Sequence, residues 1–514
     1  MNRRAFLKSC GVVAGGLAFC GCQKSDGGVM LTSNTGKTQI SGKRPNLLLI
    51  MTDQHRFDCL GCMGNDKIQT PNLDAIAADG VIFNYAYSQS PSCTPARAGL
   101  LTGLSPWHHG MLGYSRVAEH YKYEKPRMLR EAGYYTFSVG KQHWYPQKTL
   151  HGYHGTLVDE SGRVESPGFI SDYRRWFKEV APDKNPDETG IGWNEYVSGV
   201  YKLPEELHPT VWTGKTACDF IKNYDKQQPW MMKVSFARPH SPYDPPQRFW
   251  DMYNTEDMPS PWVGDWTDRF KTKAGGANAW YGDLGVAQAK ESRHGYYGSI
   301  TFIDEQVGKV IQSLKDRGVY DETLIVFTAD HGDMLGDHHH WRKTYAYEGS
   351  ARIPMLLRWP ENMKTKVVRG ATLDLTVDLR DVLPTFLDAA GAKIPDDMDG
   401  MSMLRPVRAK NPNWREYIDF EHATCYDSLN NWCALTDGKI KYIYCYTDGS
   451  EQLFNLENDP HELTQLSGKS EYQGTLALWR GRMVEHFAER GDRYVKNGVL
   501  QKHGTILKSP NFPS

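Results

Sequence analysis

Three stretches dominated by apolar residues mark the first two thirds of the chain. They cover residues 46–52, 230–236 and 323–328, the second of them more weakly than the others. Such runs are typical of strands that are buried on both faces of a helix-covered parallel sheet. Apolar residues also recur at helical spacing over residues 300–314, and Gly318 supplies a stop for this helix. Helices that alternate with buried strands predict an α/β fold with a large, doubly wound, mostly parallel sheet.

The pattern changes after about Pro406. Residues 439–446 alternate between polar and apolar, an Asp-Gly turn follows at 448–449, and residues 452–456 form a second short strand. This order predicts a hairpin of a small antiparallel sheet. Residues 476–490 follow with the pattern of a helix. The sequence therefore predicts a smaller C-terminal α+β subdomain with its own antiparallel sheet.

The first 43 residues resemble an export signal followed by a tether. Paired arginines at positions 3 and 4 precede an apolar stretch, residues 11–19, that is too short to span a bilayer. Residues 1–22 are therefore expected to direct export, and Cys22 is the better candidate for lipid attachment, which would tether the protein to a membrane. Residues 23–43 are polar and rich in Gly, Ser and Thr, which predicts a flexible linker. We expect the protein in the periplasm or on the outer cell surface.

Size and charge agree with two folded parts. We place the large domain at residues 44–405 and the C-terminal subdomain at 406–514, since 514 residues are too many for one small core. The formal net charge of −1 gives no reason to expect nucleic acid as a partner. Ten cysteines, three of them in the leader, imply no dense disulfide framework. Cys59 and Cys62 lack a second pair that would complete a zinc site, and we interpret them as part of a loop.

Residues that can bind a metal follow both strong strands directly. Asp53 and Gln54 follow the first, and Asp330 and His331 follow the third. Because the carboxyl ends of parallel strands lie at the same edge of a sheet, these side chains are expected to meet. Either Asp alone could simply cap the next helix or open a turn. Carboxylate and amide oxygens suit a hard divalent cation such as Ca²⁺, whereas the imidazole of His331 is more usual on a transition metal.

Residues 90–103 carry the most specific pattern in the chain. A lone Cys at the start of a helix is most often structural, but here Cys93-Thr-Pro-Ala-Arg97 resembles the Cys-x-Pro-x-Arg signature of the type I, formylglycine-dependent sulfatases of the alkaline-phosphatase-like superfamily. The Gly-Leu-Leu-Thr-Gly that follows at 99–103 matches the continuation of that signature. Further matches occur in the family's order along residues 45–466, at 46–53, 70–74, 133–143, 235–240, 328–332, 343–349 and 453–462.

The resemblance implies two cofactors and one partner enzyme. A maturation enzyme would oxidise Cys93 to Cα-formylglycine, and one Ca²⁺ would be held by Asp53, Gln54, Asp330 and His331 together with residue 93. The family often has Asp in place of Gln54 and Asn in place of His331. Both variants can still bind a metal, so these departures leave the identity of the metal and its affinity open.

The resemblance also assigns roles around the nucleophile. One hydroxyl of the hydrated aldehyde would attack the sulfur and expel the alcohol, and the second would then release sulfate. Arg97 would stabilise the nucleophile from one helical turn away, while Lys141 and Lys343 would bind the sulfate oxygens. His143 would be the base that triggers the release of sulfate, and His240 the acid that protonates the leaving oxygen.

The expected substrate is the sulfate ester of a sulfated carbohydrate, such as a glycosaminoglycan fragment. Export and the abundance of aromatic residues favour it, and the aromatic segment 144–201 is expected to shape its pocket. Two alternatives remain from the sequence: a phosphonate monoester or phosphodiester hydrolase on the same fold, and an inactive protein that binds sulfated glycans. The three histidines at 338–340 either contact the substrate or belong to a loop without a role in binding.

Overall fold

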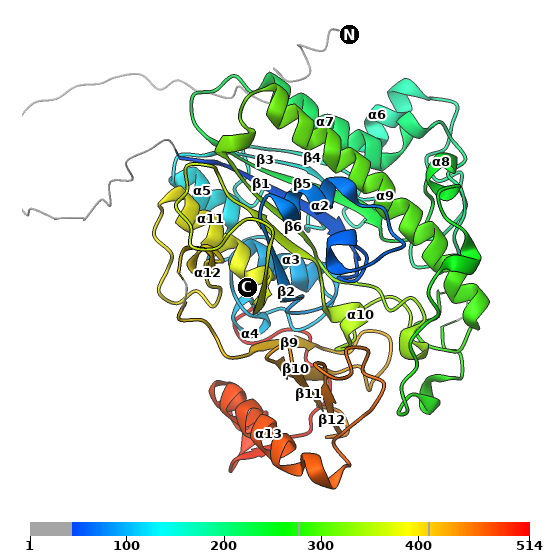
Figure 1. Cartoon of the computed structure of the whole chain (residues 1–514), viewed down its shortest axis with the longest axis vertical. Coiled ribbons are helices and arrows are strands. Elements are labelled where there is room, and N and C mark those ends of the chain that lie inside the picture. Colours follow the sequence, from blue (N-terminus) through cyan, green and yellow to red (C-terminus); the bar gives the residue numbers. More distant parts are fainter. Residues whose placement is uncertain (1–43, 276–277, 410–411, 514) are drawn as a thin grey trace, which may run out of the picture. The chain divides into compact units, whose positions relative to one another are not determined.

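A computed structural model describes residues 44–275, 278–409 and 412–513, and eight strands of this part form one sheet in the order β4-β3-β5-β1-β6-β7-β2-β8 (Figure 1). Neighbouring strands are parallel except at β7, which is antiparallel to both β6 and β2. This confirms the predicted mostly parallel sheet. The strands are β1 (Asn46–Asp53), β2 (Val81–Tyr87), β3 (Tyr135–Gly140), β4 (Gly155–Val158), β5 (Trp230–Pro239), β6 (Thr323–Ala329), β7 (Met355–Arg358) and β8 (Ala371–Asp378).

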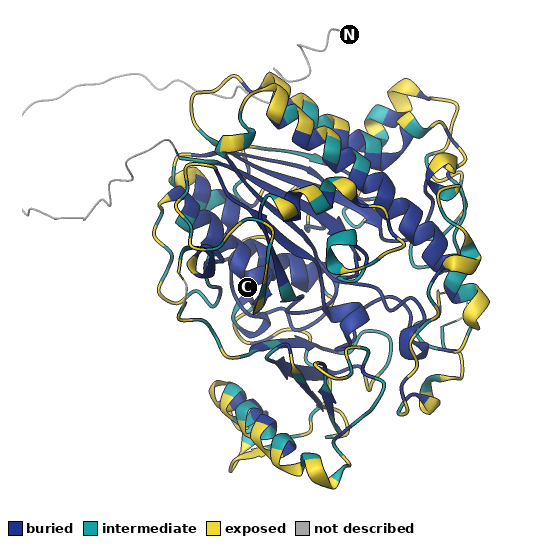
Figure 2. Cartoon of the chain, in the orientation of Figure 1, coloured by how far each residue is buried: buried dark blue, intermediate teal, exposed yellow. Residues whose placement is uncertain are grey.

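The continuous apolar runs arise because both faces of the central strands are covered (Figure 2). Leu48 and Ile50 of β1 pack into one hydrophobic core, whereas Leu47 and Leu49 point to the opposite core. Helices α7 and α9 lie on the first side and α5, α11 and α12 on the other (Figure 1). The first layer is α2 (Pro71–Ala78), α6 (Asp172–Val180), α7 (Pro209–Asn223) and α9 (Val286–Asp316), and the second is α3 (Cys93–Thr102), α5 (Lys125–Glu131), α11 (Val382–Ala390) and α12 (Leu404–Arg408).

Helix α9 is about twice as long as its apolar stripe predicts. It begins at Val286 rather than near residue 300, and its N-terminal half buries polar groups such as Arg293, which donates to Asp337 Oδ1 over 2.6 Å. Because a polar buried face has no apolar periodicity, the pattern reveals only the second half. Gly318 follows the end of the helix with φ 69°, as expected of a stop. Among the described residues, neither α9 nor another helix is long and apolar enough to cross a membrane.

The predicted C-terminal hairpin is part of a four-stranded antiparallel sheet in the order β12-β11-β10-β9. Its strands are β9 (Ile418–His422), β10 (Trp432–Thr436), β11 (Ile440–Cys445) and β12 (Glu451–Asn455). Helix α13 (Gln473–Phe487) covers one face of this sheet, through side chains such as Trp479. The other face packs against Tyr87, Tyr345 and Tyr347 from the rest of the chain.

The structure bears on the expectations for the cysteines but not on those for the N-terminal segment. The predicted export signal, the lipid attachment at Cys22 and the linker all lie outside the described residues, and the boundary at 405/406 stays a prediction. The cysteines of the described part are seven free thiols, in agreement with the absence of a disulfide framework. Cys59 is buried and Cys62 half-buried at a short turn of 3₁₀-helix, Gly61–Met63, which agrees with their interpretation as a loop.

The topology determines where the functional residues come together. Strands β3, β5, β1 and β6 are adjacent and parallel, so their carboxyl ends lie at one edge of the sheet. Lys141 follows β3, His240 follows β5, Asp53 ends β1 and Asp330 follows β6. Strand β2 has the same direction and leads into α3, which begins at Cys93.

Candidate active site

Four predicted ligands meet at this edge of the sheet. Asp53, Cys93, Asp330 and His331 are all buried, and one ligand atom from each lies within 4.8 Å of the others. The two strands bring the acidic pairs together, and helix α3 inserts its first residue between them. The sequence predicted this meeting from the strand ends and from the Cys93 motif.

Arg97 connects the ends of four strands. Its guanidinium donates to Asp53 Oδ2 and to Asp330 Oδ2, each over 2.9 Å. It also donates to the backbone oxygen of Lys141 over 2.7 Å and to Ser235 Oγ over 3.1 Å. The role expected from the motif was a contact beside the nucleophile, but the hydrogen bonds of this fully buried side chain go to the carboxylates and to β3 and β5. Arg97 therefore holds the two acidic ligands in place.

The remaining donor atoms fit a divalent cation. Arg97 occupies one oxygen of each carboxylate, which leaves Oδ1 of Asp53 and Asp330 toward the cluster. His331 Nδ1 donates to the Gly332 oxygen over 2.9 Å, which leaves Nε2 facing the cluster, 3.3 Å from the Cys93 sulfur. Burial raises the pKa of Asp53, but Lys141, His240 and Arg97 outweigh it and hold that pKa well below its usual range. Burial lowers the pKa of His331, but the charges of Asp330 and Cys93 outweigh it and raise that pKa, so a bound cation would replace the proton of this imidazole.

Gln54 belongs to the same site, and its backbone has an unusual conformation there. Its backbone has φ 67°, in the left-handed region that a residue with a side chain rarely adopts. In this conformation the backbone N–H donates to Asp330 Oδ1 over 3.0 Å, and the side-chain oxygen accepts from Lys343 Nζ over 3.0 Å. The amide donates to Asp333 Oδ2 over 2.5 Å, a carboxylate that the sequence analysis did not single out.

Two ammonium groups flank the Cys93 sulfur. Lys343 Nζ lies 3.4 Å and Lys141 Nζ 3.9 Å from Sγ, and Lys141 also contacts Asp53 Oδ2 over 2.6 Å. Burial and the Asp53 carboxylate raise the pKa of the Cys93 thiol, but the charges of Lys141, Lys343 and His331 outweigh them and lower this pKa to about 7. The groups that stabilise a thiolate here would equally stabilise a tetrahedral oxyanion bound at the same place.

His240 lies at the site as predicted. Its Nδ1 donates to the Ser241 oxygen over 2.9 Å, and its Nε2 accepts from Lys343 Nζ over 2.8 Å. Burial lowers the pKa of His240 well below its usual value, and the charges of Lys343 and Lys141 lower it further. The imidazole is therefore neutral when no anion is bound.

His143 has a separate set of partners. Its Nε2 lies 3.3 Å from Glu165 Oε1 and 3.4 Å from the Tyr114 hydroxyl, and it also contacts Arg163. Its Nδ1 is buried and has no hydrogen-bond partner among the described residues. Burial lowers the pKa of His143, and the positive charge of Arg163 lowers it further.

Several supporting residues carried no signal in the sequence. The buried Glu160 accepts the backbone N–H of Gln142 over 2.9 Å and that of His143 over 2.7 Å, which fixes the segment between Lys141 and His143. His422 from the C-terminal sheet contacts Ser92 Oγ over 2.7 Å, directly before the nucleophile. Neither residue lies in a motif, because only the fold brings them near the site.

Two protein-family models match the chain. The family model described as Sulfatase matches residues 45–392, and the one described as N-sulphoglucosamine sulphohydrolase, C-terminal, matches residues 336–489. The chain belongs to the sulfatase family. This sulfatase is accordingly a sulfuric ester hydrolase, and the family implies a metal ion and a formylglycine, to which the buried cluster around Cys93 corresponds.

Relatives cover nearly the whole chain. An arylsulfatase of Clostridium perfringens is 38% identical to this sulfatase over 477 residues, which cover 89% of this chain and 98% of that protein. A choline-sulfatase of Rhizobium meliloti is 31% identical over 468 residues, or 86% and 87% of the two chains.

Solved structures share the fold at low identity. The phosphonate monoester hydrolase of Agrobacterium radiobacter has a TM-score of 0.71 at 24% identity, and the match covers 91% of this chain and all (100%) of the other. A protein solved with its substrate D-glucosamine-2-N,6-O-disulfate has a TM-score of 0.70 at 21% identity, covering 88% and 99%.

Replacing Arg97 should destabilise the fold as well as the site. In Arg97→Met the carboxylates of Asp53 and Asp330 lose their common partner, and breaking a buried ion pair from one side costs about 3–5 kcal/mol. We expect a clear fall in the midpoint of thermal unfolding, followed by circular dichroism. Arg97→Lys, which keeps the charge but reaches fewer acceptors, should lie between this variant and the parent. Equal midpoints for all three proteins would show that Arg97 does not hold the two carboxylates together.

Proposed function

We propose that this sulfatase removes a sulfate ester from a sulfated carbohydrate, using a formylglycine made from Cys93 and one bound Ca²⁺. The observation that carries the proposal is the position of Cys93, buried between two ammonium groups and beside two carboxylates. A structural cysteine needs neither set of charges.

The lysines would bind the sulfate group. Lys141 and Lys343 are distant in the sequence, but the side chains of both reach the Cys93 sulfur. Each can therefore donate to a different sulfate oxygen. When formed, the formylglycine hydrate would supply a hydroxyl nucleophile at the position of Sγ. When bound by Asp53, Asp330, His331 and Gln54, the cation would polarise the sulfate and lower the pKa of that hydroxyl.

His240 would protonate the leaving oxygen. Without an anion its pKa is lowered by burial and by Lys343 and Lys141. A bound sulfate ester is negative and offsets these two charges, which makes a proton on Nε2 accessible when the substrate is present. The hydrogen bond from Nδ1 to the Ser241 oxygen keeps the ring oriented with Nε2 toward Lys343.

His143 would act as the base that releases sulfate. It follows Lys141 by two residues, and Glu160 holds the backbone between them. Its Nε2 lies beside Glu165 and Arg163, and its Nδ1 is buried without a partner among the described residues. A neutral imidazole keeps one nitrogen that can accept a proton.

Aromatic and polar side chains beside the site support a sugar as the alcohol. The Trp193 ring is 5.6 Å from the His240 ring, and the Arg163 guanidinium lies 5.1 Å over Trp193. Tyr114, 41% exposed, and Glu165 lie next to His143. Ring faces pack against the C–H groups of sugars, while Arg163 and Glu165 can bind hydroxyls. The protein solved with D-glucosamine-2-N,6-O-disulfate, which shares the fold, gives further support.

The two alternatives are less well supported. The likeness to a phosphonate monoester hydrolase is one of fold at 24% identity, whereas the relatives above 30% identity are named as sulfatases. An inactive glycan-binding protein would have no need for the complete set of Cys93, Lys141, His240 and Lys343. Our proposal also includes a formylglycine-generating maturation enzyme as partner, export to the periplasm or cell surface, and a lipid at Cys22.

The first test concerns residue 93. In protein from its natural host, the tryptic peptide that ends at Arg97 should have the mass deficit of a thiol replaced by an aldehyde. The same protein should release sulfate from glucosamine 6-sulfate or from tetrasaccharides of heparin or chondroitin sulfate, and Cys93→Ala should abolish this release. Faster turnover of a phenyl phosphonate than of every sulfate ester would favour the phosphonate hydrolase. An unmodified Cys93 without sulfate release would favour the glycan-binding protein.

The cation can be tested without turnover. Ca²⁺ at a hundredfold excess over its Kd should stabilise the folded protein by about 2.7 kcal/mol, which raises the midpoint of thermal unfolding after treatment with EDTA. Asp330→Asn should remove this increase, whereas Asp66→Asn, at an exposed residue outside the ligand cluster, should retain it. A larger increase with Zn²⁺ than with Ca²⁺ would contradict the choice of calcium and would agree with the imidazole of His331 as a ligand.

The role of His240 predicts a dependence on the leaving group. For a sugar sulfate, whose alkoxide needs a proton, His240→Asn should lower kcat/KM by about 10²–10⁴-fold. For 4-nitrophenyl sulfate, whose phenolate leaves without a proton, the loss should be much smaller. The exposed His120 provides the control His120→Asn, which should change neither rate. The same loss for both substrates would mean that His240 does not protonate the leaving oxygen.

A further inference from the structure

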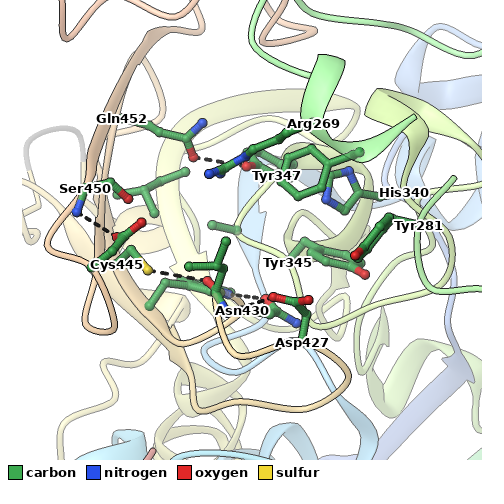
Figure 3. Close-up of a pocket in the computed structure, with 16 residues that line it drawn as sticks. Arg269, Tyr281, His340, Tyr345, Tyr347, Asp427, Asn430, Cys445, Ser450 and Gln452 are labelled. Atoms are coloured by element: carbon green, nitrogen blue, oxygen red, sulfur yellow. Dashed lines mark hydrogen bonds between the residues drawn. The ribbon is translucent and has the colours of Figure 1, made fainter. Parts of the chain in front are cut away.

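A second pocket lies where the C-terminal sheet meets two segments of the larger part (Figure 3). Its lining comes from Arg269, Phe270 and Tyr281, from His340 and residues 345–347, and from the strands β10, β11 and β12 with their loops. It holds about 600 Å³ of space, part of which is open to solvent. None of the residues assigned above to the sulfate ester lines it.

Aromatic rings form one part of its walls. Phe270, Tyr281, Tyr345 and Tyr347 surround the space, and the buried Trp432 lies against it from the C-terminal sheet. Several of these rings touch one another or His340, as in the 4.4 Å separation of the His340 and Tyr345 rings. Flat, preformed aromatic walls of this kind suit the C–H faces of a sugar ring.

Polar groups on its edges have no partners within the described part of the chain. Tyr347 donates its hydroxyl to Gln452 Oε1 over 3.0 Å, which leaves the Gln452 amide nitrogen unpaired. His340 Nδ1 donates to the His338 oxygen over 2.7 Å, which leaves Nε2 unpaired. The guanidinium of Arg269 has no acidic or carbonyl partner and lies over the Phe270 ring. A hydroxyl-rich ligand would satisfy such groups.

Opposite charges face each other across the pocket. In Figure 3 Arg269, Tyr347 and His340 lie along one edge, opposite Asn430 and Asp427. One oxygen of Asp427 accepts the Leu429 N–H, and the other remains for a ligand. Since the positive and negative groups are on opposite edges, the pocket suits an uncharged polar ring better than a second sulfate group.

A short backbone segment joins a residue of the sulfate site to a residue that lines the pocket. Lys343 reaches Cys93, and Tyr345, which lines the pocket, is two residues on, a distance of at most about 7 Å along the backbone. Thr344 between them is fully buried, and its backbone oxygen accepts from Trp432 Nε1 over 3.0 Å. The sheet that forms the pocket therefore also fixes Lys343.

Tyr426 occupies the position between the two sites. Its ring stacks on Trp280 at 6.0 Å and lies under the Arg342 guanidinium at 4.5 Å, and the next residue, Asp427, lines the pocket. Its hydroxyl is close enough to Lys343 and Cys93 for their charges to act on it. The backbone of Tyr426 has φ 110°, a strained conformation of the kind that persists at functional sites.

We propose that this pocket binds a second sugar unit of the glycan, joined to the unit whose sulfate ester lies at Cys93. This inference rests on the proposed carbohydrate substrate and extends it: the enzyme acts on oligosaccharides in preference to single sulfated sugars. It also gives His340, one of three adjacent histidines whose role the sequence left open, a place in substrate binding.

The test compares substrates of three sizes in the full-length, formylglycine-containing enzyme. We would measure kcat/KM for 4-nitrophenyl sulfate, for glucosamine 6-sulfate and for the best tetrasaccharide from heparin or chondroitin sulfate. Arg269→Ala and Tyr281→Ala should each lower kcat/KM for the tetrasaccharide by about tenfold, the value of one hydrogen bond to a charged group or one ring contact. The two smaller substrates should be unaffected, since they do not reach the pocket.

A matched control lies two residues from Arg269. Lys271 is exposed, lies outside the pocket and pairs with Asp268 on the surface, so Lys271→Ala should leave all three rates unchanged. A loss that is equal for all three substrates, or a parent enzyme that prefers glucosamine 6-sulfate to every tetrasaccharide, would overturn the inference.

Failure of the carbohydrate proposal would look different. In that case 4-nitrophenyl sulfate would be hydrolysed but none of the sugars would release sulfate. The pocket would then be tested directly, by calorimetric titration of the parent and of Arg269→Ala with a desulfated tetrasaccharide. Binding that Arg269→Ala weakens would support the pocket as a sugar site independently of the substrate, and absence of binding would overturn it.

Discussion

The arrangement of this sulfatase depends on one guanidinium buried among the ends of four strands. Arg97 donates to Asp53 from β1 and to Asp330 after β6, and it also bonds to the backbone after β3 and to Ser235 of β5. Two carboxylates a few ångströms apart in a dry interior would repel each other strongly, and a guanidinium is the group that can satisfy both in fixed geometry. Because Arg97 lies one turn after Cys93 on α3, the same contacts place the nucleophile.

The charges of the site leave room for two ligands of opposite sign. The carboxylates of Asp53 and Asp330 face the three cations of Arg97, Lys141 and Lys343, all of them buried. Arg97 uses only one oxygen of each carboxylate, and the other oxygens, of which Asp330 Oδ1 also accepts the backbone N–H of Gln54, face the cluster where a cation would bind. The lysines extend beyond the carboxylates to the Cys93 sulfur, where an anion would complete the charge balance. A buried set of charges is costly to maintain, and binding both ligands gives a physical reason for it.

The C-terminal sheet contacts the segments that carry Cys93 and Lys343. His422 on β9 contacts Ser92 just before the nucleophile, and Trp432 on β10 bonds to the backbone next to Lys343. The same sheet forms the wall of the second pocket. A small subdomain that packs with one face on the larger part thus connects the position of the reacting groups with the shape of the surface around them.

Particular residues show which features of the fold and the site could be predicted from the sequence. Asp53 and Asp330 could be placed together because buried apolar runs reveal parallel strands, and parallel strands end at one edge. Cys93, Lys141 and His240 came from motifs in which a few residues at short spacing carry the chemistry. Helix α9 was found only over its apolar half, since polar buried groups such as Arg293 leave no periodicity.

The sequence by itself thus determined the fold class, the family motif and the residues at the strand ends, because each of these depends on short-range order along the chain. The tertiary structure alone decided that Arg97 binds carboxylates, that Glu160 holds the segment before His143, and that His340 lines a pocket with residues of the C-terminal sheet. These contacts join residues that are distant in sequence, and their energies come from burial and from paired charges. No local pattern records such pairings, since they exist only once the strands and the two sheets have packed.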